Sequence, residues 1–145
     1  MKVFCIYLVA AIVAARADPP GGDDGRVFLH TEPYEVNEEP NAVARVRIDR
    51  EGPTDRRTTV NYTLLPDTAT AGHDFNGRPG SITFEVDETT HYISIPIIDD
   101  DEMESNEMFE VCLDGADNAL LGATTCVAMY IIDDELKAYL EAARH

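Results

Sequence analysis

The stretch from Ile97 to Phe109 constrains the fold of this chain more strongly than any other. Two apolar residues, Ile97 and Ile98, run into six carboxylates within nine residues, and an apolar segment restarts at Phe109. At about 4 Å and a surface-like dielectric constant, each contact between like charges costs up to about 4 kcal/mol. A folded domain with this loop between two strands therefore needs a counter-ion. Ca²⁺ suits it, because that ion takes about six to eight oxygen ligands from flexible loops.

The first 17 residues have the pattern of a secretory leader. Lys2 supplies the positive start, residues 3–15 are apolar, and Ala15-Arg16-Ala17 matches a cleavage site with small residues. The apolar run is shorter than the roughly 20 residues of a membrane-spanning helix. We therefore predict a signal peptide over residues 1–17, a Pro/Gly/Asp-rich linker over 18–25 and a secreted product with no membrane span after the leader is removed.

The charge balance limits the classes of partner. The chain has 28 acidic and 11 basic residues and a net charge of −17, and loss of Lys2 and Arg16 with the leader changes the charge to −19. Nucleic acids and anionic membranes require a basic face, so we expect neither as a partner. Clustered acids favour cations or the basic surface of a protein.

From Arg26 onward, apolar and polar residues alternate as in half-buried strands. The length after the leader suits one domain. The expected strands are centred on Val27–Leu29 with Tyr34–Val36 (one strand split by Pro33), Ala44–Ile48, Val60–Leu64, Ile82–Val86, Ile93–Ile97, Phe109–Leu113 and Val127–Ile131. They predict an all-β fold, an Ig-like Greek-key β-sandwich of about seven strands over residues 26–135. Pro96 indicates an edge or a bulge.

The last residues follow a different pattern. Leu136, Tyr139, Leu140 and Ala143 recur at helical spacing, and Asp133 or Asp134 could cap the start of a helix. We predict a short C-terminal helical tail over residues 136–145. A helix of this length is marginal alone in water, so it could dock, fray or continue into a longer chain.

Two cysteines remain after the leader, Cys112 and Cys126. In both expected strands the apolar set points inward, so both cysteines point outward from the same face. An oxidising compartment would permit a disulfide between them. Two free thiols are the alternative, because the sequence does not fix the register of the strands.

In a Greek-key sandwich the acidic segments meet at one end. The acidic loop at 99–107 joins two strands and so defines a pole, and the antiparallel neighbours bring Asp133–Glu135, Asp74 and Glu38-Glu39 to that pole. The opposite pole receives residues 49–57, of mixed sign, and the loop 114–125. This asymmetry indicates a pole that holds several calcium ions rather than an evenly charged exterior.

The same residues carry a resemblance to a known family. The segments Thr68–Phe75, Gly80–Phe84, Ile97–Phe109 and Ile131–Glu135 together resemble the Calx-beta domain, found in sodium/calcium exchangers and in extracellular adhesion and matrix proteins. The shared pattern covers about residues 26–135. The chain departs from it at Phe75, where Tyr is frequent, and at Glu135, where a third Asp is common.

The resemblance implies a calcium-binding sandwich with a defined set of ligands. Calcium-binding members carry ligands at the positions of Glu38, Asp74, Asp99, Asp100, Glu104, Glu107, Asp133 and Asp134, and a backbone carbonyl ligand at the position of Glu102. All of these side chains are acidic in this chain. Ca²⁺ is therefore the expected cofactor.

Other motifs fit less well. An EF-hand that began at Asp99 would have Met103 and Glu104 at its fifth and sixth positions, where it needs Asp or Asn and then Gly. Zinc prefers His and Cys, and the four histidines lack ligand spacing. The chain has no Trp to support sugar binding by a glycosidase, and no nucleophile triad or phosphate loop. We expect no enzyme.

One modification motif is present. Asn61-Tyr62-Thr63 is an N-glycosylation acceptor, and Asn61 is expected to face outward from its strand. An acceptor sequence that is not used is the alternative.

Taken together, the sequence predicts a secreted calcium-binding module whose acidic loops coordinate Ca²⁺ at one pole, in cell adhesion or matrix interaction with an extracellular protein partner. Two alternatives stay open. One is a metal-independent adhesion module that binds a basic partner, and the other is an acidic protein of mineralised matrix.

Overall fold

The computed structural model describes residues 24–144, so the predicted signal peptide and most of the predicted linker lie outside the described residues. Within this range the chain forms strands and one helix. In chain order they are β1 (Arg26–Leu29), β2 (Tyr34–Asn37), β3 (Val43–Glu51), β4 (Thr58–Pro66), β5 (Gly80–Phe84), β6 (Thr90–Pro96), β7 (Glu107–Asp117), β8 (Leu120–Leu121), β9 (Cys126–Ile132) and α2 (Asp134–Ala143).

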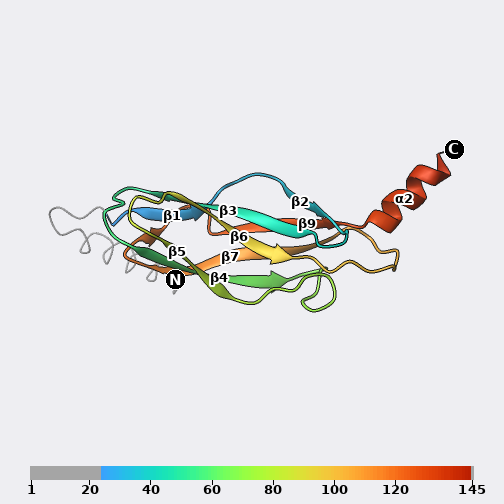
Figure 1. The fold of residues 1–145 in the computed structure, drawn as a ribbon, viewed down its shortest axis with the longest axis horizontal. Helices are drawn as coiled ribbons and strands as arrows, with labels where there is room; N and C mark the ends of the chain where they lie inside the picture. The colour runs from blue at the N-terminus through green and yellow to red at the C-terminus, as the bar shows by residue number, and fades with distance from the viewer. Residues whose placement is uncertain (1–23, 145) are drawn as a thin grey trace, which may run out of the picture.

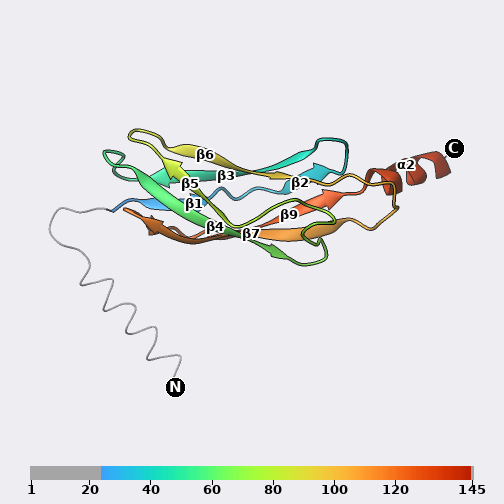
Figure 2. The ribbon, with the colours of Figure 1, turned by 60° about the horizontal axis from the view of Figure 1, so that its bottom comes forward.

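The strands form two sheets that face each other as a sandwich (Figures 1 and 2). One sheet has the order β6-β3-β1-β8 and the other the order β2-β9-β7-β4-β5. The all-β sandwich is therefore confirmed, and β3 lies beside β6 while β7 lies between β4 and β9, as the Greek-key pattern predicts. Strand β5 pairs with β4, whereas a constant-type Ig domain has this strand in the opposite sheet.

The first strand is split between the two sheets. β1 runs antiparallel to β3, and β2 runs parallel to β9. Pro33 stands between them, and a proline has no N–H with which to continue a ladder. Pro96 likewise ends β6, which is an edge strand, as its missing donor predicts.

The chain after β7 differs from the sequence prediction. The loop expected over 114–125 contains the last residues of β7 and the two-residue strand β8, which pairs in parallel with β1. β7 passes a β-bulge, because Asn61 of β4 lies opposite Gly115 while Tyr62 lies opposite Leu113. The extra residue, Asp114, breaks the alternation by which a strand is identified from sequence.

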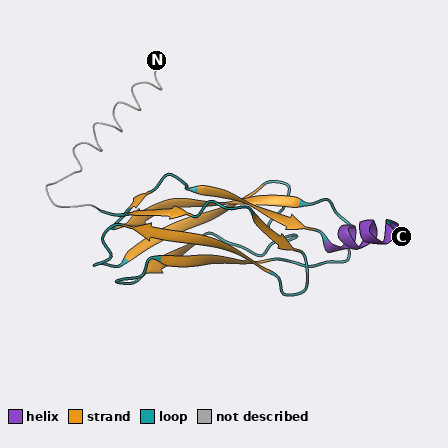
Figure 3. Cartoon of the chain, turned by 90° about the horizontal axis from the view of Figure 1, so that it is seen from above, coloured by secondary structure: helices purple, strands orange, loops and turns teal. Residues whose placement is uncertain are grey.

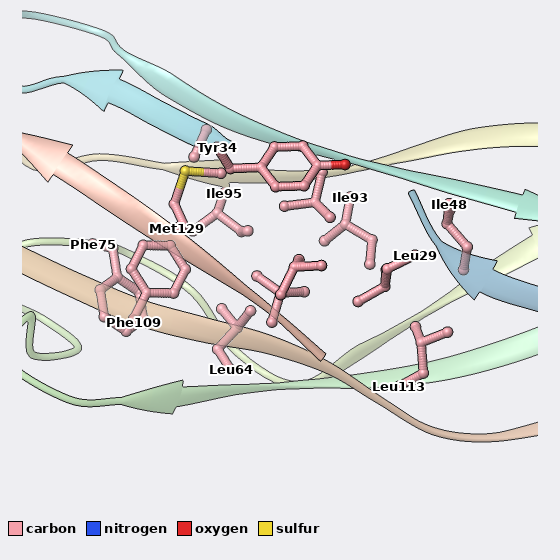
Figure 4. Packing of buried hydrophobic residues seen from close by; sticks show 14 of the residues in the cluster. Leu29, Tyr34, Ile48, Leu64, Phe75, Ile93, Ile95, Phe109, Leu113 and Met129 are labelled. Atoms are coloured by element: carbon pink, nitrogen blue, oxygen red, sulfur yellow. The ribbon is translucent and has the colours of Figure 1, made fainter. Parts of the chain in front are cut away.

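The space between the sheets is filled by apolar side chains from both of them (Figure 4). Ile48 and Ile93 come from one sheet and Phe109 and Met129 from the other, and all four are at most 1% exposed. The ring of Phe75, from the β4–β5 loop, stacks on Phe109 with 4.1 Å between the ring centroids. Burial of a side chain of this size contributes about 1.5–3 kcal/mol, so these contacts hold the sandwich together.

One expected core residue lies outside the core. The prediction placed Val86 on the inward face of a strand, but β5 ends at Phe84 and Val86 is 52% exposed. A turn follows the strand, in which the N–H of Glu88 donates to the carbonyl of Glu85 and Asp87 has a φ of 68°. The turn removes Val86 from the pleat, which is why the prediction for this residue was wrong.

The predicted C-terminal helix is confirmed as α2, which projects from one end of the sandwich (Figure 3). The side chain of Asp133 caps it by accepting a hydrogen bond from the N–H of Leu136. None of its residues is buried, and Tyr139 and Leu140 are more than half exposed. Among residues 24–144, no helix has the length and apolar character that a membrane span requires.

The predicted disulfide between Cys112 and Cys126 is confirmed. The two residues lie directly opposite each other on β7 and β9, with their Cα atoms 4.1 Å apart. Cys112 lies between the core residues Val111 and Leu113 and so points to the outer face, yet it is only 5% exposed.

Replacement of both cysteines by serine should lower the free energy of unfolding. The disulfide closes a short loop, with a sequence separation of 14, and a loop of that size is worth about 3 kcal/mol in chain entropy. Urea unfolding of the double variant and of the wild-type chain, with and without reductant, measures this. The reductant should destabilise the wild-type chain alone, and equal stabilities without reductant would contradict the prediction.

Candidate metal centre

Four segments of the chain come together at the end of the sandwich from which α2 projects (Figures 1 and 2). The acidic residues of these segments act on one another's ionisation. Glu38 directly follows β2, and Asp74 lies in the β4–β5 loop. Residues 99–104 belong to the β6–β7 loop, and Glu107 opens β7. Asp133 and Asp134 follow β9. The sequence prediction named this end of the sandwich.

Three carboxylates, two from loops and one from the first residue of β7, form a close group. One oxygen each of Asp74, Glu104 and Glu107 lie within 4.8 Å of one another. Ca²⁺ binds oxygens at about 2.4 Å, so two oxygens on opposite sides of one ion are about 4.8 Å apart. The three oxygens therefore have a spacing that one calcium ion can span.

The hydrophobic core fixes the backbone beside two of these carboxylates. Asp74 directly precedes Phe75, and Glu107 stands two residues before Phe109, and the two aromatic rings are stacked (Figure 4). The N–H of Ile98 donates to the carbonyl of Asp74 at 3.0 Å, which joins the acidic β6–β7 loop to the β4–β5 loop. Core packing thus holds like charges close together.

Hydrogen bonds from Thr70 orient the carboxylate of Asp74. Its Oδ2 accepts from the N–H of Thr70 at 2.6 Å and from the Thr70 hydroxyl at 3.1 Å. The turn between them needs Gly72, which has a φ of 90°. The sequence interpretation did not identify Thr70, because a threonine four residues before an aspartate is too common to indicate this role.

Asp133 connects the acidic loop to the C-terminal helix. Its side chain is buried, and Oδ2 accepts a hydrogen bond from the N–H of Glu104 while Oδ1 accepts one from the N–H of Leu136. One carboxylate therefore fixes two segments that are far apart in the sequence. A second turn forms where Oδ1 of Asp100 accepts from the N–H of Glu102 at 2.7 Å.

Burial and mutual repulsion disfavour ionisation of these groups. Burial, followed by the charges of Asp100 and Asp133, raises the pKa of Glu38 to about 7. Burial and the neighbouring Asp74 raise the pKa of Glu107 to about 7. The pKa of Glu104 is also raised, first by burial and then by Asp74. Each shift reflects burial first and the charge of neighbouring carboxylates second.

The outer part of the centre contains further acids. The pKa of Asp99 is raised by burial and then by the charges of Asp134 and Asp101. A side-chain hydrogen bond with Asp134 raises the pKa of Glu135, because two carboxyl groups can form a hydrogen bond only when one of them is protonated. Oδ1 of Asp134 and Oε2 of Glu135 are buried and have no hydrogen-bond donor in residues 24–144. Asp101 was not among the predicted ligands.

No ion pair within residues 24–144 offsets the negative charge at this end of the molecule. The ion pairs in the described part of the chain involve Asp49, Asp55, Glu85 and Glu88, and none of them includes a carboxylate of the centre. The donor set is thus all oxygen, anionic and in need of positive charge, which fits a hard divalent cation.

The chain belongs to the Calx-beta domain family, whose sequence profile matches residues 22–135. It is 30% identical over 128 residues to the sodium/calcium exchanger Calx of Drosophila melanogaster, and the aligned region covers 88% of this chain and 13% of the exchanger. It is 35% identical over 105 residues to adhesion G-protein coupled receptor V1 of Danio rerio, and the aligned region covers 70% of this chain and 2% of the receptor. The chain therefore spans only a small part of these relatives.

A solved structure has the same fold. The crystal structure of the calcium binding domain CBD12 of CALX1.1 superposes with a TM-score of 0.70 at 30% sequence identity, over 76% of this chain and 46% of that chain. The family that the sequence pattern suggested is thus confirmed by sequence and by fold.

The ion-free domain should lose stability as the pH rises from about 5 to about 8. The pKa values of Glu38 and Glu107 are about 7 in the folded state and have an ordinary value of 4.5. Between these values the folded state binds more protons than the unfolded state, so the stabilisation is complete below the ordinary pKa and is lost as the pH passes through 7. Urea unfolding in chelator at a series of pH values measures the slope.

The variant Glu38→Gln should flatten this pH dependence, because it removes one of the two groups. Glu35→Gln, a change at an exposed residue of the preceding strand, is the matched control and should leave the slope as in the wild-type chain. A wild-type slope in Glu38→Gln would show that this carboxyl does not titrate as described.

Proposed function

We propose that this chain is a calcium-binding module in which ions at one end of the sandwich bridge loops that otherwise repel one another. The observation that supports this most directly is the approach of Asp74, Glu104 and Glu107, with oxygens within 4.8 Å and no basic partner among the described residues. The relatives named as a sodium/calcium exchanger and as a calcium binding domain point to the same ion.

The proposed ligands are the side chains of Glu38, Asp74, Asp99, Asp100, Glu104, Glu107, Asp133 and Asp134, with the backbone carbonyl of Glu102. The charges that act on each carboxylate define two groups. The inner group lies around Asp74 and Glu107, and the outer group lies around Asp99 and Asp134. One divalent ion would leave most of this charge uncompensated. We therefore propose that the end binds more than one ion, with Asp100, whose charge acts on both Glu104 and Asp99, between the two groups.

The chemistry of the ligands favours calcium over other ions. Zinc sites use His and Cys, and the only described cysteines are joined in the disulfide between β7 and β9. Magnesium demands nearly ideal octahedral geometry and retains waters, whereas calcium accepts irregular sets of about six to eight oxygens. Carboxylates that come from four separate segments supply an irregular set of that kind.

In this mechanism, ion binding replaces repulsion by attraction. Without the ion, the buried Glu38 and the partly buried Glu107 have raised pKa values, which measure the cost of ionising each of them in the folded domain. A bound cation lowers that cost and cross-links the loops. Extracellular calcium modules bind at about 10⁻⁴–10⁻³ M, and binding stabilises the folded state by mass action.

The proposed setting is extracellular. The predicted leader over residues 1–17 and the disulfide between Cys112 and Cys126 both suit an oxidising compartment. One relative is named as an adhesion receptor. We propose that the rigid, ion-loaded end serves cell adhesion or matrix interaction through a protein partner.

Calcium titration of Glu107→Gln tests the function. This change removes one charge from the inner group at nearly constant shape, so the affinity for calcium should fall at least about tenfold, which corresponds to about 1.4 kcal/mol. Titration calorimetry of the domain measures it.

The matched control is Glu110→Gln, at a residue on the same strand that lies opposite Ala128 of β9 and outside the acidic cluster. It should bind as the wild-type chain does. Equal affinity in all three proteins would remove Glu107 from the site, and failure of the wild-type chain to bind calcium would refute the proposed function.

A further inference from the structure

The side chain of Asn61 stands on the outer face of the five-stranded sheet. Asn61 lies in β4 next to the core residue Val60, and it is exposed. No hydrogen bond to its side-chain amide is present in residues 24–144, so the amide nitrogen is available for reaction. Asn61-Tyr62-Thr63 is the only Asn-x-Ser/Thr sequence in the whole chain.

The neighbours of Asn61 on both adjacent strands are small. It lies opposite Ser81 of β5 and opposite Gly115 of β7. A Cβ atom added to Gly115 would meet nothing within 4 Å, so the space above this position is open. In a strand that has a partner on each side, large cross-strand neighbours would normally crowd a central residue.

The surface around this site is rich in hydroxyl groups. Thr59 and Thr63 lie two residues away on either side of Asn61, and the hydroxyls of Thr59 and Thr83 are 3.3 Å apart. Hydroxyls can donate and accept hydrogen bonds, as sugar hydroxyls do. The sheet therefore offers a polar surface to a carbohydrate, with the exposed Asp117 opposite Thr59 at its border.

We propose that Asn61 carries an N-linked glycan when the chain passes through a secretory pathway. The donor is an oligosaccharide joined to a lipid pyrophosphate. The amide nitrogen of Asn61 forms a bond to the anomeric carbon of the first sugar and loses one proton, and the bond from that carbon to the pyrophosphate oxygen breaks. The lipid pyrophosphate leaves with the bonding electrons, and the Asn-x-Thr sequence is the acceptor.

The position of the site separates it from the metal centre. The far end of β4, at Pro66, pairs with Phe109 near the acidic end of the sandwich. Asn61 lies five residues earlier, which is about 17 Å along a strand. The glycan and bound calcium can therefore be present together, and the glycan should not change calcium affinity.

The glycan would also cover an exposed edge. β5, directly beside Asn61, is an edge strand of its sheet, because no strand within residues 24–144 pairs with its outer side. Edge strands invite pairing with another chain unless they are blocked. A glycan on the neighbouring strand would oppose such pairing.

Expression of the full chain in eukaryotic secretory cells, behind a leader of known efficiency, tests the proposal. Treatment with an amidase that removes N-linked glycans should increase the electrophoretic mobility of the wild-type chain by one discrete step. Mass spectrometry should then find aspartate at position 61. The same chain behind its own first 17 residues tests the predicted signal peptide separately.

Three variants complete the experiment. Asn61→Gln and Thr63→Ala should show no mobility step, because the first removes the nitrogen and the second removes the hydroxyl of the acceptor sequence. Thr63→Ser keeps that hydroxyl and should retain the step, which separates loss of the acceptor from misfolding. Absence of the step in the wild-type chain behind the efficient leader would overturn the proposal, and the calcium titration would be unaffected by that result.

Discussion

Repulsion among carboxylates at one end of the sandwich is the constraint on which the arrangement of this molecule depends. Glu38, Asp74 and Asp133 are buried there, and Glu104 and Glu107 are close to them. Isolated in water, these loops would separate. Burial first, and then the charges of neighbouring carboxylates, raise the pKa values of Glu38 and Glu107 to about 7, which reflects the cost of ionising these groups in the folded domain.

The force that opposes the repulsion comes from the core and from a few hydrogen bonds. The stacked rings of Phe75 and Phe109 lie next to the segments that carry Asp74 and Glu107. Asp133 accepts hydrogen bonds from the acidic loop and from the first turn of α2. Apolar packing therefore offsets the repulsion among the carboxylates. A cation that bound to them in the folded state alone would stabilise that state by mass action.

The sequence was sufficient for the parts of this account that follow from periodicity and charge. Alternation from Arg26 onward predicted the sandwich, and the order of the strands predicted that acids far apart in the sequence would meet. The two-residue strand β8, the pairing of β5 with β4 and the role of Thr70 depend on a bulge and on tertiary contacts that leave no periodic signal. Val86 was misplaced for the same reason, because a turn at Asp87 overrides its β propensity.

Thermal unfolding of the domain in excess chelator, in millimolar calcium and in equal magnesium tests the central claim most directly. At about ten times the dissociation constant, each site adds about 1.4 kcal/mol, which corresponds to an increase in Tm of about 5 °C for a domain of this size. We expect an increase of at least that size with calcium and a much smaller one with magnesium. No increase with calcium, or an equal increase with magnesium, would contradict the account and leave the carboxylates as a charged surface.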